Sequence, residues 1–169
     1  DPRVGAERSI LSLQGTDKIT VSEDSILSLG GSDSFSIDFW LRPTATSEAV
    51  MVKGGNSEKQ FAMHGASNSL NFKGQDDAAT FLVSDEAHPL EEWSHFTVVH
   101  DAGDVTFYRN GVETGSGTNS IAEGEDSALT IGNHSDGSDP LNGHIANVSI
   151  IGEALSSDDV ADLDAGYAG

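Results

Sequence analysis

The sequence predicts an all-β fold, a two-sheet antiparallel jelly-roll sandwich with one short C-terminal helix. Apolar residues alternate with polar ones in short segments along most of the chain, and Gly and Asn separate these segments. More than ten short, regularly spaced strands of this kind are typical of sandwiches and jelly rolls. A chain of 169 residues is the right size for one such domain.

The stretch 93–114 predicts three consecutive antiparallel strands, around which the rest of the chain is organised. Its first two strands alternate apolar and polar residues and are separated by a turn-forming segment at 101–104. The pair Asn110-Gly111 tolerates positive φ and predicts a type I′ hairpin before the third strand. Because such a meander buries one face, the remaining chain must supply a second sheet.

The N-terminal half predicts further strands. Residues 10–21 have the pattern of two short strands joined by a turn at Gly15-Thr16-Asp17. The clearest strand is 34–43, where Phe, Ile, Phe and Leu share one face and Ser36, Asp38, Trp40 and Arg42 share the other. Other short strands are predicted at 49–53, 60–64, 69–72, 80–83, 128–132 and 145–151.

One short helix is predicted near the C-terminus. Ser156 is a suitable N-cap, and Asp159 lies three residues later in an acidic first turn that suits the helix dipole. Val160 and Leu163 are the expected buried contacts, and Gly166 is expected to close the helix.

The charge balance excludes two classes of partner. The chain has 28 acidic and 8 basic residues and a formal net charge of −20. Such a surface repels nucleic acid and anionic lipid, and no apolar run approaches the roughly 20 residues needed for membrane insertion. The acidic excess favours a halophilic or marine source, with an ordinary acidic secreted domain as the alternative. The absence of cysteine leaves the compartment open.

Four segments, in this order, resemble the laminin-G-like, concanavalin A-like jelly-roll domains: ILSLQGTDKITV, FSIDFWLRP, EWSHFTVVHDAGDVTFYRNG and LTIGNHSDGSDPLNGHIANVSIIGEALSSDDVADL. In that family a Trp opens the meander, an Asn-Gly closes its hairpin, and a Gly-containing strand leads into Ala-Leu-Ser and an acidic helix. The resemblance covers about residues 8–166. We expect a single domain over 1–169 that is a fragment of a larger protein. The resemblance also implies a concave face with rim loops and frequently a bound calcium ion.

Calcium is expected in the loop 133–139, where Asn133, Asp136 and Asp139 offer hard oxygen ligands around a flexible glycine. The alternative is an ordinary acidic turn. The turn at Asp17 is the next candidate for a metal ligand, although Ala146 and Asn147 replace the acidic residue usual in the family's late strand.

Candidate ligand contacts are Trp40, Asp38 and Arg42 on one face of the strand 34–43, together with His134 in the predicted calcium loop. Aromatic stacking is the usual means of holding a sugar ring, so this face has the composition of a binding platform. Structural packing of Trp40 is the favoured alternative.

Enzymatic activity is not expected. The nearest approach to the paired carboxylates of glycoside hydrolases is Glu123-Gly124-Glu125-Asp126, which lacks a third alternate acid and is better interpreted as a solvated loop. Gly115-Ser116-Gly117 lacks the strand-to-helix setting of a nucleophile elbow.

The sequence therefore predicts a non-catalytic extracellular binding or adhesion module. Its expected partner is a glycan or surface glycoprotein, met through rim loops or the concave face at a cell or virion surface, beside neighbouring domains of the parent protein. The alternative is a structural module of a surface layer, adhesin or virion with no small ligand.

Overall fold

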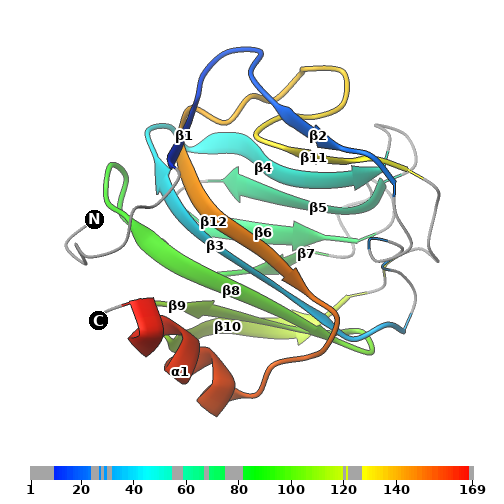
Figure 1. The fold of residues 1–169 in the computed structure, drawn as a ribbon, viewed down its shortest axis with the longest axis vertical. Coiled ribbons are helices and arrows are strands. Elements are labelled where there is room, and N and C mark those ends of the chain that lie inside the picture. Colours follow the sequence, from blue (N-terminus) through cyan, green and yellow to red (C-terminus); the bar gives the residue numbers. More distant parts are fainter. Residues whose placement is uncertain are drawn as a thin grey trace.

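The computed structural model describes residues 10–23, 27, 29, 32–54, 59–66, 69–74, 82–119, 121 and 127–167. These residues form two six-stranded antiparallel sheets and one helix (Figure 1). The predicted all-β sandwich with one C-terminal helix is therefore confirmed.

Sheet A contains, in spatial order, β1 (Ile10–Leu13), β12 (Gly143–Ile151), β3 (Phe35–Pro43), β8 (Ser94–Asp101), β9 (Asp104–Arg109) and β10 (Val112–Thr118). Sheet B contains β2 (Ile19–Val21), β11 (Leu129–Ile131), β4 (Ser47–Gly54), β5 (Lys59–Ala66), β6 (Ser69–Lys73) and β7 (Leu82–Ser84). Because β1 and β2 belong to different sheets, the predicted turn between them carries the chain from one sheet to the other.

The meander β8–β9–β10 forms as predicted. Asn110 and Gly111 have φ of 51° and 78°, the two positive values that a type I′ turn requires. Ala102 and Gly103 also have positive φ, at 50° and 107°, so the first connection is a two-residue turn between the paired Asp101 and Asp104. Both hairpins are therefore tight.

Strand β3 is buried on both faces. Its apolar side chains, Phe35, Ile37, Phe39 and Leu41, lie in the main core with residues from both sheets. Its opposite face is also buried at Ser36, Asp38 and Trp40, each at most 1% exposed. Something other than sheet B must therefore cover the outer face of sheet A.

That cover is the helix α1 (Ser157–Tyr167), which lies against the outer face of sheet A (Figure 1). Ser156 is its N-cap, since Ser156 Oγ accepts from the backbone N–H of Asp159 at 3.2 Å. Hydrogen bonds from Ser156 hold the pKa of Asp159 below its ordinary value. Val160 is fully buried, but the expected end at Gly166 is wrong, because the helix continues through it to Tyr167.

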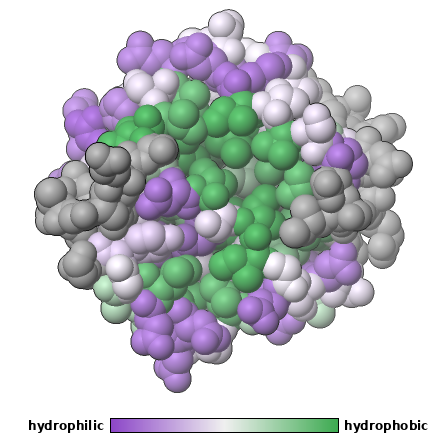
Figure 2. Space-filling model, in the orientation of Figure 1, coloured by the Kyte–Doolittle hydropathy of each residue, from purple (hydrophilic) through white to green (hydrophobic). Residues whose placement is uncertain are grey.

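The edge strand β1 leaves apolar side chains accessible. Ile10 is 54% and Leu11 40% exposed. In Figure 2, hydrophobic residues form a broad band across the face of the molecule seen in Figure 1, with hydrophilic residues around its rim. The face of the molecule seen in Figure 2 is thus less polar than the net charge of the chain suggests.

His100 lies inside the sandwich. Its side chain is fully buried, its ring stacks on Phe35 at a centroid distance of 4.9 Å, and Nδ1 donates to the Asp33 carbonyl oxygen at 2.8 Å. Burial lowers the pKa of His100 below its ordinary value of 6.5, and the Asp33 carbonyl and nearby carboxylates oppose this effect in part. The ring is therefore held neutral.

We expect acid to destabilise the fold in part through His100. The unfolded chain takes up a proton on this ring near pH 6.5 whereas the folded protein resists it, so the free energy of unfolding falls as the pH drops below that value. For one group the slope reaches at most about 1.4 kcal/mol per pH unit. Urea unfolding of wild type and His100→Leu between about pH 7.5 and 5 measures it. Equal slopes in the two proteins would show that another group is responsible.

Candidate functional site

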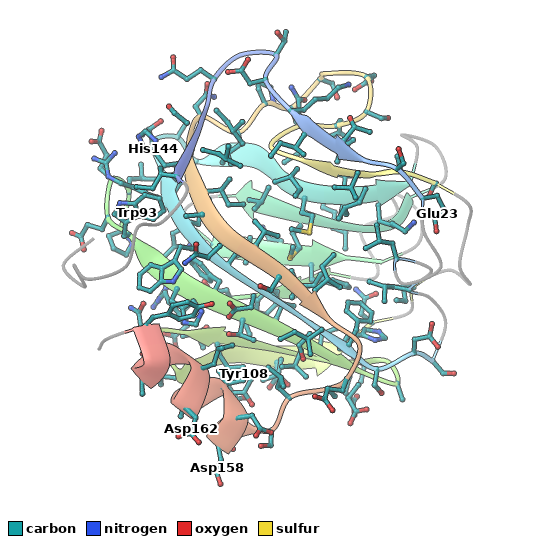
Figure 3. All side chains as sticks on the ribbon, viewed as in Figure 1. Glu23, Trp93, Tyr108, His144, Asp158 and Asp162 are labelled. Carbon is teal, nitrogen blue, oxygen red and sulfur yellow. The ribbon has the colours of Figure 1, made fainter. Side chains whose placement is uncertain are left out.

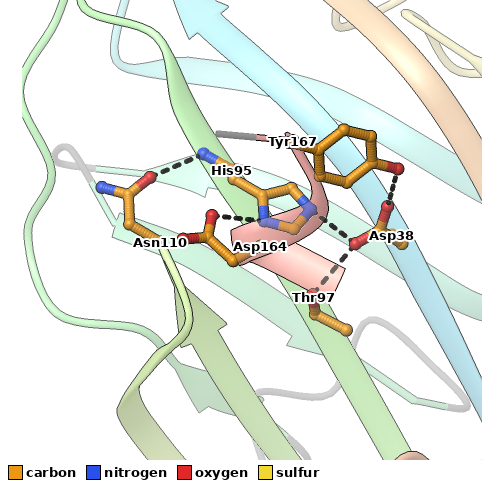
Figure 4. Close-up of polar contacts among 6 residues, drawn as sticks. All are labelled: Asp38, His95, Thr97, Asn110, Asp164 and Tyr167. Carbon is orange, nitrogen blue, oxygen red and sulfur yellow. Dashed lines mark hydrogen bonds and ion pairs between the residues drawn. The ribbon is translucent and has the colours of Figure 1, made fainter. Parts of the chain in front are cut away.

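A buried polar cluster joins sheet A to α1 beneath the helix (Figure 4). Asp38 accepts hydrogen bonds from Thr97 Oγ1 at 3.0 Å and from the hydroxyl of Tyr167 at 3.1 Å. His95 Nε2 lies 2.6 Å from the same carboxylate, and its Nδ1 lies 2.9 Å from Asp164 on α1. The imidazole can donate to both carboxylates when both ring nitrogens carry a proton. The cluster thus ties the helix to β3 and β8.

Trp40 is part of this packing. Its ring stacks on His95 at 5.1 Å, and the Tyr167 ring meets it edge-on at 6.0 Å. With Trp40 and Asp38 each 1% exposed, neither side chain is open to a sugar. An exposed platform at these two residues is therefore wrong, and the alternative, structural packing of Trp40, is what the structure shows. The cause is α1, which covers this face.

Arg42 lies near the end of β3 and outside the buried cluster. Its Nε donates to the Glu91 carbonyl oxygen at 2.9 Å, and Nη2 lies 3.3 Å from the Glu91 carboxylate. The Arg42 side chain is 29% exposed and that of Glu91 67% exposed. Of the three expected contacts on this face of β3, Arg42 is the one that solvent reaches.

The loop 133–139 lies beside the turn that follows β1. Asn133 Nδ2 donates to the Gly15 carbonyl oxygen at 3.3 Å, and Lys18 Nζ donates to that of Ser135 at 2.5 Å. The two segments that the sequence suggested separately for calcium ligands therefore form one rim. Asn133 Oδ1 is buried and has no hydrogen-bond partner among the described residues, which is a suitable state for a cation ligand.

The predicted carboxylate ligands have local partners. Asp17 and Asp136 each accept a bond from a nearby backbone N–H, at 3.2 and 3.0 Å. Asp139 Oδ2 lies 3.5 Å from Nε2 of His134, whose side chain is 3% exposed. Within the described ranges, no group of three His, Cys, Asp or Glu side chains is placed to hold a metal ion. Among these predicted ligands, Asn133 thus has an unpartnered side-chain oxygen, whereas the carboxylates of Asp17, Asp136 and Asp139 each have a partner.

An open groove of about 370 Å³ runs over the outer face of β2 and β11. Thr20 pairs with Thr130, while the adjacent Ile19 and Ile131 pack in the core, so the threonines face away from sheet A. Ser135 connects the groove to the 133–139 loop. The residues that line the groove are Lys18, Thr20, Gly54, Ser127, Ala128, Thr130 and Ser135.

One end of the groove is fixed by a buried cation. Lys53 Nζ donates to the carbonyl oxygen of Ser127 at 2.5 Å and to the carboxylate of Glu23, which Figure 3 labels. Since Lys53 is fully buried, this pair links the segment after β2 to the segment before β11. The groove therefore has a supported wall.

Sequence reasoning missed the residues that complete the buried cluster, His95, Asp164 and Tyr167. Their contacts span 57 to 129 positions of the chain, so no local pattern marks them. One signal was present. A Trp alternates with Ser and Asp on the supposedly solvent-facing side of 34–43, and a large aromatic residue there indicates a covering element.

Two six-stranded antiparallel sheets, with a short helix over one of them, define a jelly-roll sandwich. The chain belongs to the Concanavalin A-like lectin/glucanases superfamily (Laminin_G_3), whose family model matches residues 13–161. This confirms the resemblance to laminin-G-like, concanavalin A-like domains. No curated protein shows significant sequence similarity to the chain.

Solved structures with the same fold include the native heptameric SAP-like pentraxin from Limulus polyphemus. The TM-score is 0.70 with 18% identity, over 92% of this chain and 80% of the pentraxin chain. The binding domain of botulinum neurotoxin serotype G is similar at TM-score 0.68 and 16% identity, over 92% of this chain and 41% of that one. A structure of botulinum neurotoxin type C is similar at a TM-score of 0.69 and 17% identity, over 95% of this chain and 46% of the neurotoxin chain. The chain thus spans less than half of the neurotoxin structures, and these identities show the fold alone.

Among the described residues, no helix is long and apolar enough to span a bilayer.

We expect Asp38→Asn to destabilise the protein by about 2 to 4 kcal/mol, because the change removes a buried carboxylate that Thr97, His95 and Tyr167 all contact. Urea unfolding measures the loss. Asp162→Asn is the matched control, since Asp162 lies on the exposed side of α1 (Figure 3) and should stay within about 0.5 kcal/mol of wild type. If both variants unfold alike, the buried cluster does not hold the helix in place.

Proposed function

We propose that this chain is a non-catalytic extracellular module that recognises carbohydrate, alone or on a surface glycoprotein. The groove over β2 and β11 carries the proposal. Its volume of about 370 Å³ lies within the range of small-ligand sites, roughly 300 to 1,000 Å³. The module would act at a cell or virion surface as one part of a larger protein.

The chemistry of the groove suits a neutral glycan. Its lining includes Thr20, Ser127 and Ser135, whose hydroxyls donate and accept hydrogen bonds as sugar hydroxyls do. Thr130 also lines the groove, but its side chain is 3% exposed and its hydroxyl donates to the Val52 carbonyl oxygen at 3.2 Å. Lys18 adds a donor and also holds the rim through its bond to Ser135. Thr20 and Thr130 lie on the paired strands β2 and β11, so the sheet fixes the backbone of the groove floor before a ligand binds.

The same lining supports a binding role without catalysis. Hydrolysis of a glycosidic bond requires two carboxyl groups about 5 to 9.5 Å apart across the scissile bond. None of the described lining residues is acidic. The segment with Glu123 and Glu125, the nearest catalytic candidate in the sequence, lies outside the described residues.

The similar structures support the choice of partner. Cell entry of botulinum neurotoxin type C is dependent upon interaction with two ganglioside molecules, and another neurotoxin binding domain was solved in complex with rat synaptotagmin II. Gangliosides carry oligosaccharides, and synaptotagmin II is a protein. A glycan or a surface glycoprotein is therefore a reasonable partner for this chain.

The test is an array of neutral and acidic oligosaccharides probed in about 1 M NaCl, where screening removes most of the repulsion from the acidic surface. We expect wild type to bind neutral oligosaccharides. Thr20→Tyr should abolish this binding, because the ring would fill the groove and an exposed strand position accepts it.

Thr106→Tyr is the matched control. Thr106 lies on β9 and lines a separate groove of about 330 Å³ on sheet A, so this variant should bind like wild type. Equal melting temperatures of the two variants would show that folding is intact. Loss of binding in Thr106→Tyr but not in Thr20→Tyr would show that the binding site lies on sheet A. A clean negative over the whole array would favour the structural module.

We also propose that the rim formed by the 133–139 loop and the Asp17 turn holds calcium through Asn133, Asp136 and Asp139. The unpartnered oxygen of Asn133 supports this proposal. A bound cation would also relieve the repulsion between neighbouring carboxylates.

We expect millimolar calcium to raise the melting temperature in molar salt relative to chelator. At a hundredfold excess over Kd, binding to the folded state alone stabilises it by about 2.7 kcal/mol. Asp136→Ala and Asp139→Ala should remove the shift, whereas Asp158→Ala, exposed on α1, should retain it. An unchanged wild-type melt, or a shift that persists in the first two variants, would reject these ligands.

A further inference from the structure

A compact group of side chains lies at one end of β3, β8 and β12, on the outer face of sheet A. Figure 3 shows Trp93, which directly precedes β8, beside His144 on β12. Their ring centroids are 6.1 Å apart, and both side chains are partly exposed. Arg42 on the intervening strand pairs with His144, and the neighbouring pair Leu41 and Ser94 sets Arg42 next to Trp93. The three side chains therefore form one surface.

Glu91 completes this surface and is held in a disfavoured backbone conformation. Its φ is 61°, in the left-handed region that residues with a Cβ rarely adopt. Its N–H donates to the Pro43 carbonyl oxygen at 2.8 Å, and its own carbonyl oxygen accepts from Arg42 Nε at 2.9 Å. These bonds fix the strained residue so that its carboxylate meets Arg42 Nη2. Strain of this kind is concentrated at ligand-binding and active sites.

We propose that Trp93, Arg42, Glu91 and His144 form a second ligand site, which binds a neutral pyranose unit. The proposal rests on the proposed carbohydrate-binding function but places a site on the sheet opposite the groove. The indole face packs against the C–H face of a sugar ring. The Arg42–Glu91 pair offers donors and acceptors side by side, which suits two neighbouring hydroxyls.

The charges at this site favour a neutral sugar over an acidic one. The carboxylate of Glu91 already balances the guanidinium of Arg42, and the exposed Glu92 adds a further negative charge. The chain as a whole carries −20. A sugar carboxylate would have to displace Glu91 from Arg42 and enter this field, whereas hydroxyl groups can bind with the ion pair intact.

The test uses tryptophan fluorescence during titration with neutral hexaoses of glucose, galactose and mannose, and with a galacturonate hexaose as the acidic probe. The chain has two Trp residues, and Trp40 is 1% exposed under α1, so a change on sugar binding reports Trp93. The sheet-B groove contains no aromatic residue among its described lining and should not alter this signal. We expect a neutral hexaose to change the emission and the acidic hexaose to leave it unchanged.

Variants separate a binding role from a structural one. Glu91→Gln should weaken binding of the neutral hexaose about tenfold or more, because a neutral amide cannot form the ion pair with Arg42. Glu92→Gln makes the same charge change one residue away and should bind within about twofold of wild type. Trp93→Phe, which keeps an aromatic face, should bind more tightly than Trp93→Ala in titration calorimetry, which does not depend on Trp93 emission, and the two variants should have similar melting temperatures.

The outcomes distinguish this site from the groove. A hexaose whose binding is lost in Thr20→Tyr without any Trp93 signal would overturn this inference and leave the groove proposal standing. A Trp93 signal that persists in Thr20→Tyr but is lost in Glu91→Gln supports this site independently. If no hexaose alters the emission, if the acidic hexaose alone does, or if Glu92→Gln weakens binding as much as Glu91→Gln, the inference is wrong.

Discussion

The structure depends on the burial of both faces of β3. Its inner face supplies aromatic and aliphatic side chains to the core, as alternation dictates, but its outer face carries Asp38 and Trp40, each 1% exposed. A buried carboxylate is costly unless it is hydrogen-bonded and paired. Thr97 and His95 on the neighbouring strand and Tyr167 on α1 meet this requirement together, so the helix is bound to the sheet by polar contacts as well as by apolar packing. The C-terminal segment is therefore integral to the sandwich.

Covering the middle of sheet A determines where ligands can bind. The side chains that look most like a sugar platform in the sequence lie beneath α1, and Arg42, farther along the same strand, remains accessible. Sheet B has an open groove on its outer face at β2 and β11. On the two proposals made above, the module would present sites on opposite sheets. Such an arrangement could bridge two glycan chains or engage one surface bivalently, and the second contact would then gain from a high effective concentration.

The strands were predictable because their signals are local. Period-two alternation identified 34–43 and the meander, and Asn110-Gly111 marked a hairpin whose φ values are both positive. The partners of the strands were not local. Alternation identifies β1 and β2 as strands but does not show that they join different sheets. Asp38 likewise has the pattern of a solvent-facing residue, because its cover, Tyr167, lies 129 positions away. The end of α1 was missed because Gly166 has a low intrinsic helix propensity, which predicts a helix end there. The helix instead continues to Tyr167, whose hydroxyl is hydrogen-bonded to Asp38 on the sheet.

The acidic residues and the proposed ligand sites have different physical requirements: the first need solvent, and the second need groups that bind hydroxyls. A net charge of −20 has to be spread over solvent-facing positions, such as the exposed Asp158 and Asp162 on α1, where salt can screen it. The groove has hydroxyls and Lys18 in its described lining, and at the rim of sheet A the charge of Arg42 is matched by Glu91. The acidic excess, which a halophilic source would explain, can therefore lie outside both proposed ligand surfaces. Its origin stays a prediction, but its placement is consistent with recognition by hydroxyl groups, whose hydrogen bonds salt weakens far less than it weakens ion pairs between exposed charges.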